Sequence, residues 1–169
     1  MRKSSRNLFF LGLAVALLGA GVWAELGREQ TLAVQPLTAL DPATVQRFEI
    51  RCRDCTTRRF ERAGAGWRML EPYAQPANAD AVARLLGIVR APVRTRANFA
   101  DYAPSKLGLA PAQFTLTYDD VTIEIGNEDP IEHDRYVRLG AELLRVPDRF
   151  SARLLESAES ELADPKAVQ

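Results

Sequence analysis

The sequence predicts an α+β protein: one N-terminal apolar helix, followed by an antiparallel, strand-rich domain with two short helices. Three observations lead to this fold class. Residues 8–24 form an uncharged apolar segment. Further along the chain, apolar and polar residues alternate in several short segments joined by tight turns, which is typical of antiparallel strands. Two other segments place apolar residues at helical spacing.

The uncharged segment has the properties of a membrane helix. At 1.5 Å per residue, a helix over 8–24 spans about 25 Å, close to the ~30 Å hydrocarbon core. It is apolar on all sides, whereas a surface helix of a soluble protein has a polar face. Arg2, Lys3 and Arg6 precede it and the first acid is Glu25. The excess of positive charge before the segment predicts a cytoplasmic N-terminus and an exported remainder.

Two interpretations of this segment remain open. In the first, it is an uncleaved anchor whose Trp23 lies at the outer interface of the membrane. In the second, it is a signal peptide cleaved at the Val22-Trp23-Ala24 site. We favour the anchor and expect a single-pass inner-membrane protein with a periplasmic domain. We expect a basic cytoplasmic tip (1–6), a transmembrane or signal segment (7–25) and a linker (26–44). An envelope-facing α+β domain (45–157) and an acidic tail (158–169) follow.

The domain is predicted to contain two groups of strands separated by a helix. The first group comprises strands over 48–52, 57–63 and 67–70. The second comprises strands over 114–118, 121–125, 136–139 and 143–146. Between the groups, Asn78 is a typical N-cap, and Val82, Leu85, Leu86 and Val89 form the apolar stripe of one helix. Asp148 is expected to cap a second short helix near the end, after which the chain is expected to fray.

Composition excludes one class of function. The chain has 22 basic and 22 acidic residues, and three of the basic ones precede the apolar segment, so the remainder is mildly acidic. Nucleic-acid binding requires clustered lysine and arginine, and we therefore predict no nucleic-acid partner. The acid-rich stretch 127–134 matches no calcium-loop spacing. We predict no metal site and no cofactor.

Cys52-Arg53-Asp54-Cys55 is the motif in this sequence that most clearly suggests chemical reactivity. In an exported protein the pair is expected to form a structural disulfide across a tight turn. Alternatively it is a redox-active pair, although the helix N-terminus that would activate a thiolate is missing. Two further alternatives are unpaired thiols and half of a zinc site, for which the single distant histidine does not complete four ligands.

Arginines concentrate in the first predicted hairpin. A docking face for an anionic glycan, a lipid headgroup or a protein partner is one interpretation. The alternative is a solvent-exposed face on which these cations pair across strands with neighbouring glutamates. The candidate docking residues are Arg47, Arg51, Arg53, Arg58 and Arg59.

Several short motifs, taken together, resemble a bacterial family. They are Trp67 with Pro72, Pro76-Ala77-Asn78-Ala79, Leu107-Gly108-Leu109 with Pro111, Ile125-Gly126, Pro130, Tyr136-Val137 and Val146. Over roughly 45–150 their order and spacing are similar to those of domain of unknown function 4340. The resemblance implies a membrane-anchored, envelope-facing β-rich domain, and some relatives occur beside auxiliary components of ABC-type export systems. It implies no reaction and no catalytic residues.

These observations favour a non-catalytic envelope protein. We expect a binding or support module and not an enzyme, and one role for it is as an accessory to an ABC-type exporter. One alternative is a periplasmic thiol–disulfide oxidoreductase that uses Cys52 and Cys55. Another is a soluble periplasmic ligand-binding domain.

Overall fold

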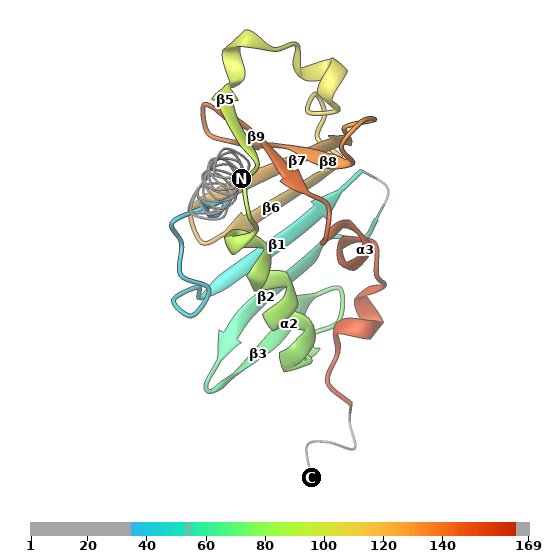
Figure 1. The fold of residues 1–169 in the computed structure, drawn as a ribbon. Coiled ribbons are helices and arrows are strands. Elements are labelled where there is room, and N and C mark those ends of the chain that lie inside the picture. The colour runs from blue at the N-terminus through green and yellow to red at the C-terminus, as the bar shows by residue number, and fades with distance from the viewer. Residues whose placement is uncertain (1–34, 54, 165–169) are drawn as a thin grey trace, which may run out of the picture. The chain divides into compact units, whose positions relative to one another are not determined.

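A single antiparallel sheet of nine strands is the frame of the part of the chain that the structure describes (Figure 1). The computed structural model describes residues 35–53 and 55–164, so the predicted membrane segment lies outside them. The strands are β1 (Arg47–Cys52), β2 (Arg58–Ala63), β3 (Gly66–Glu71), β4 (Gln75–Pro76), β5 (Thr95–Asn98), β6 (Phe114–Tyr118), β7 (Val121–Glu128), β8 (Asp134–Leu139) and β9 (Glu142–Pro147).

The sheet consists of two meanders joined side by side. Its strand order is β4-β3-β2-β1-β6-β7-β8-β9-β5, and every neighbouring pair is antiparallel. The meanders meet where β1 pairs with β6, with Phe48 opposite Tyr118 and Ile50 opposite Leu116. Both predicted groups of strands therefore belong to one sheet. The predicted antiparallel, strand-rich domain with few helices is confirmed.

Two helices lie against one face of this sheet (Figure 1). In α2 (Ala79–Leu86), the Asn78 side chain accepts hydrogen bonds from the amides of Asp80 and Ala81 at 2.9 and 3.0 Å, which confirms the predicted N-cap. A 3₁₀ turn, η1 (Gly87–Arg90), continues α2. The second helix, α3 (Ser151–Leu154), is a single turn, and the Asp148 side chain accepts from the amide of Ser151 at 2.9 Å.

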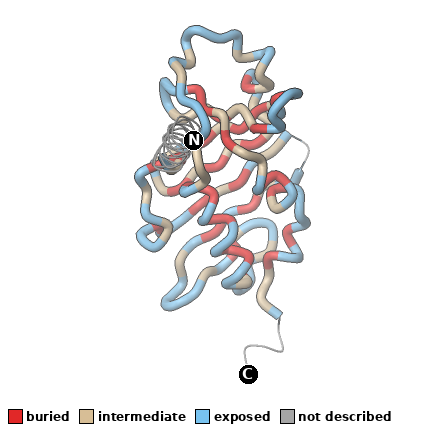
Figure 2. Tube along the Cα trace, in the orientation of Figure 1, coloured by how far each residue is buried: buried red, intermediate tan, exposed pale blue. Residues whose placement is uncertain are grey.

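The core lies between the helices and the inner face of the sheet (Figure 2). The Phe48 ring is at its centre, with ring centroids 4.5 Å from Phe60, 5.3 Å from Trp67 and 5.7 Å from Tyr118. The Tyr118 hydroxyl donates to the backbone carbonyl of Leu85 at 2.8 Å, so this buried polar group is satisfied by α2. These aromatic residues come from four strands and bind the first meander to the second.

The domain begins earlier than the sequence indicates. Residues 35–44 were expected to belong to a linker, yet Leu37 is fully buried and belongs to the core. The amide of Leu37 donates to the carbonyl of Ala91 at 2.8 Å, and Pro36 forms an isolated bridge with Pro92. Leu37 and Leu40 follow neither a helical nor a strand period, so hydrophobic periodicity does not reveal that this segment belongs to the domain.

The C-terminal segment also differs from expectation. It was expected to be a frayed acidic tail, but Ala158 and Glu161 are buried, and η4 (Ala158–Glu161) is a 3₁₀ turn. The amide of Asn78 donates to the carbonyl of Glu161 at 2.8 Å, and Ala77 bridges Leu162. We call residues 155–162 the C-terminal strap, because they lie across the start of α2 and the β3–β4 turn.

Candidate functional site

The Cys52–Cys55 pair is a disulfide that closes the loop between β1 and β2. Cys52 is the last residue of β1 and β2 begins at Arg58; the two cysteine Cα atoms are 5.4 Å apart. The expected pairing is therefore present. Among the described residues a strand, β2, follows the pair in place of the helix whose N-terminus activates the thiolate in thioredoxin-like sites. Closing a loop of about four residues stabilises the fold by about 2 kcal/mol through the unfolded state.

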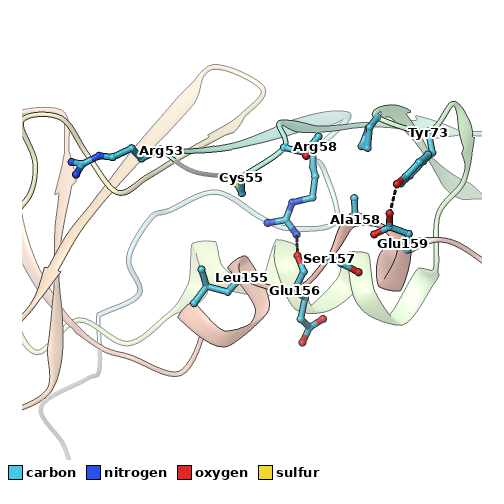
Figure 3. Close-up of a pocket in the computed structure, with 11 residues that line it drawn as sticks. Arg53, Cys55, Arg58, Tyr73, Leu155, Glu156, Ser157, Ala158 and Glu159 are labelled. Atoms are coloured by element: carbon cyan, nitrogen blue, oxygen red, sulfur yellow. Dashed lines mark hydrogen bonds between the residues drawn. The ribbon is translucent and has the colours of Figure 1, made fainter.

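Beside this loop lies a cleft of about 580 Å³, a size typical of binding sites. One wall comes from the cysteine loop, the start of β2 and the β3–β4 turn, and the C-terminal strap forms the other (Figure 3). Arg53 and Cys55 lie toward one end, and the Tyr73 hydroxyl donates to Glu159 at the other. The lining residues are Arg53, Cys55, Thr56, Arg58, Pro72, Tyr73, Leu155, Glu156, Ser157, Ala158 and Glu159.

Arg58 joins the two walls of the cleft. Its side chain is 2% exposed and donates to the carbonyl of Leu154 at 2.5 Å and to that of Glu156 at 3.2 Å. It also forms an ion pair with Glu161, whose side chain is buried to the same extent. Arg58 was expected on an exposed docking face, and this prediction is wrong. Arg58 lies two residues before Phe60 in β2, so both side chains point to the buried face of the sheet. Its guanidinium is bound there by Glu161 and the carbonyl of Glu156, both in the strap.

The Glu161 carboxylate is only partly compensated. Its Oε1 atom accepts from Arg58, whereas Oε2 is buried without a hydrogen-bond partner among the described residues. Burial raises the pKa of Glu161 from 4.5 to about 7, even though the Arg58 charge acts in the opposite direction. The carboxylate therefore costs free energy when it ionises inside the fold.

This gives a prediction for the pH dependence of stability. The folded chain holds the Glu161 proton up to about pH 7, while the unfolded chain releases it near 4.5. The folded state thus binds more protons in this window, and the free energy of unfolding should fall as pH rises from 4.5 to 7. Urea midpoints at a series of pH values measure this slope. Glu161→Gln should flatten it, and an unchanged slope in that variant would contradict the assignment to Glu161.

The other predicted docking arginines divide between two places. Arg59 pairs with Glu49 and Glu71, each at 3.0 Å, and Arg51 pairs with Glu49 at 2.7 Å. These pairs lie on the outer face of the sheet, as the alternative of a solvent-exposed charge ladder predicts. Arg47 is exposed at the other end of β1.

Arg53 alone among these exposed arginines lies at the cleft. Its Nη2 atom donates to the carbonyl of Pro111 at 3.2 Å. A smaller hollow of about 280 Å³ adjoins the cleft at this end, which we call the dimple. The dimple is lined by Cys52, Arg53, Cys55, Gln113, Phe114 and Leu155.

Sequence reasoning missed most of the cleft. Tyr73, Leu155 and Glu159 come from three separate segments, and none of them lies in a recognisable motif. One available signal was Leu155, which directly follows α3 and whose side chain is 69% exposed. Leucine on the surface of a polar segment is a weak signal when it stands alone.

The acid-rich loop 127–134 is held by internal contacts. The Asp129 side chain accepts from the amides of Ile131 and Glu132 and from the Tyr136 hydroxyl. These hydrogen bonds lower the pKa of Asp129 to about 2, the Tyr136 bond most of all. His133 Nδ1 lies 2.5 Å from Glu128. Within the described ranges, no group of three or more histidine, cysteine or acidic side chains is arranged to hold a metal ion.

Comparison of the chain with protein-family models, with curated proteins and with solved structures gave no match. The similarity to domain of unknown function 4340 therefore stays a prediction from the sequence. Over residues 35–53 and 55–164, no helix combines the length and apolar character needed to cross a membrane.

Proposed function

We propose that this chain is a non-catalytic docking module of the cell envelope. Residues 7–25 anchor it in the inner membrane, and the periplasmic domain binds a segment of another envelope protein in the cleft. The observation that carries the proposal is the cleft itself, in which a disulfide-closed loop faces a strap fixed by a buried ion pair. Because both walls are held in place, binding costs little ordering entropy.

The exposed apolar side chain of Leu155 supports a protein partner. Leu155 is 69% exposed and lines both the cleft and the dimple. An apolar side chain at the rim of a concave site gains free energy when a partner covers it. The predicted membrane anchor and the resemblance described above make a component of an ABC-type exporter the first candidate partner.

Site-specific photo-crosslinking in intact cells tests this function. A photoreactive phenylalanine analogue replaces Leu155, and in a matched variant it replaces Ile131, which is 83% exposed on the loop 129–133. We expect an adduct with one envelope protein at position 155, absent at position 131, in the membrane fraction. The same adducts from both positions would contradict docking at the cleft, and a soluble chain that begins at Glu25 would contradict the anchor.

A second candidate function is thiol–disulfide exchange, favoured by the exposure of Cys55 at the cleft. A substrate thiolate would attack the Cys55 sulfur, breaking the disulfide and releasing the Cys52 thiolate. A second substrate thiolate would then resolve the mixed disulfide, so that two substrate thiols are oxidised and the cysteine pair is reduced. A reduction potential below about −300 mV, typical of structural disulfides, together with no exchange on a model substrate would exclude this function.

A further inference from the structure

The cleft and the dimple form one continuous groove. Arg53, Cys55 and Leu155 line both hollows, so they adjoin at these residues. The dimple, at about 280 Å³, is smaller than the cleft, at about 580 Å³. Phe114 and the disulfide make its lining largely apolar. Its size and lining suit a single apolar side chain of a longer ligand.

A short stretch of backbone beside the groove has no partner in the sheet. The pairing of β1 with β2 ends where Ile50 lies opposite Arg58, and the pairing of β2 with β3 begins at Arg59 opposite Glu71. Residues 55–57, which lead into β2, therefore lie outside both ladders. They lie at the end of an inner strand, where backbone groups outside the ladders can hydrogen-bond with an extended ligand.

The charges along the groove differ between its two ends. At one end, the Glu159 carboxylate accepts from Tyr73, and the Glu156 carboxylate points away from β2 (Figure 3). Arg58 is buried, and its guanidinium is already occupied by Glu161 and by the carbonyls of Leu154 and Glu156. At the dimple end, Arg53 is exposed, and among the described residues the carbonyl of Pro111 is its only hydrogen-bond partner. Arg53 has no ion-pair partner within residues 35–53 and 55–164, so a ligand carboxylate can pair with it beside the dimple.

We infer that the groove binds an extended polypeptide segment carrying an apolar residue next to, or one residue from, an aspartate or glutamate. The apolar side chain fills the dimple against Phe114 and Leu155, and the carboxylate pairs with Arg53. The ligand backbone runs in extended form beside residues 55–57 and hydrogen-bonds to them. This inference rests on the proposed docking function and specifies the ligand of the same site.

An array of immobilised heptapeptides tests the inference with the full chain in detergent micelles as the probe. The array combines one apolar residue with aspartate, asparagine or lysine at each neighbouring position in a Gly-Ser-Thr background. We expect at least tenfold stronger binding to peptides with an apolar residue and an aspartate one or two positions apart. Asparagine and lysine should not replace the aspartate.

Charge-reversal variants with matched controls locate the binding. Arg53→Glu should exchange the preference for aspartate for one for lysine, and Leu155→Glu should abolish binding. Arg90→Glu and Ile131→Glu, at exposed positions away from the groove, should change neither.

The outcomes separate the inference from the proposed function. Equal loss of binding in the control variants, or no preference for aspartate, would overturn the inference. If crosslinking from position 155 still captures one envelope protein in that case, the docking function stands and only the ligand assignment is wrong. Absence of both the peptide preference and the crosslink would overturn both.

Discussion

Replacing Arg58 with methionine is expected to lower the free energy of unfolding by about 3–5 kcal/mol. The variant leaves the Glu161 carboxylate buried without its cation and removes the donors to the carbonyls of Leu154 and Glu156. Because the C-terminal strap is held to β2 through these contacts, it should also detach before the rest of the sheet unfolds. Urea unfolding of the full chain at pH 8, followed by tryptophan fluorescence, measures the loss.

Two further variants test whether the buried charge is the cause. Removing both charges in Arg58→Met/Glu161→Leu should recover most of the stability, since a buried ion pair can often be replaced by apolar residues without loss. Arg59→Met removes an arginine that follows directly in the strand but whose ion pairs are exposed to solvent. It should cost less than about 1 kcal/mol. Equal losses in Arg58→Met and Arg59→Met would contradict this account.

The strands that alternate most regularly were predictable because each buries one face. Phe48 and Ile50 in β1, like Leu116 in β6, lie in the core as their alternation indicates. The two strands that were missed lack this signal. β4 has only two residues, and β5, with the sequence TRAN, is an edge strand with no buried side chain. Edge strands are commonly short and polar, so periodicity does not reveal them.

The candidate site could be predicted only in part, because its contacts join distant parts of the chain. The cysteine pair and Arg53 were identified from one local motif. The inward position of Arg58 was implied by its spacing from Phe60, but its partner Glu161 lies 103 residues further along. No local pattern connects two charges at that separation. A buried ion pair of this kind requires the tertiary structure to be known before either residue can be placed.

The segment 104–113 between β5 and β6 packs directly onto β7 through two glycines. A Cβ atom at Gly126 would lie 2.1 Å from the carbonyl oxygen of Leu107, and one at Gly108 would lie 2.2 Å from Asn127 Oδ1. Gly108 also has a φ of +66°, which side chains rarely adopt. Both positions therefore admit only glycine, which gives a physical reason for Leu107-Gly108-Leu109 and Ile125-Gly126 in the sequence.

Gly126→Ala is accordingly expected to destabilise the domain by about 3 kcal/mol, because the added methyl group meets backbone that cannot move without lifting the whole segment off β7. Gly87→Ala is the matched control: its Cβ would meet nothing within 4 Å and its φ of −60° suits alanine. That variant should be stabilised by about 0.4–1 kcal/mol through the unfolded state. Urea unfolding of both variants decides the matter, since similar stabilities would mean that the 104–113 segment is not held against Gly126.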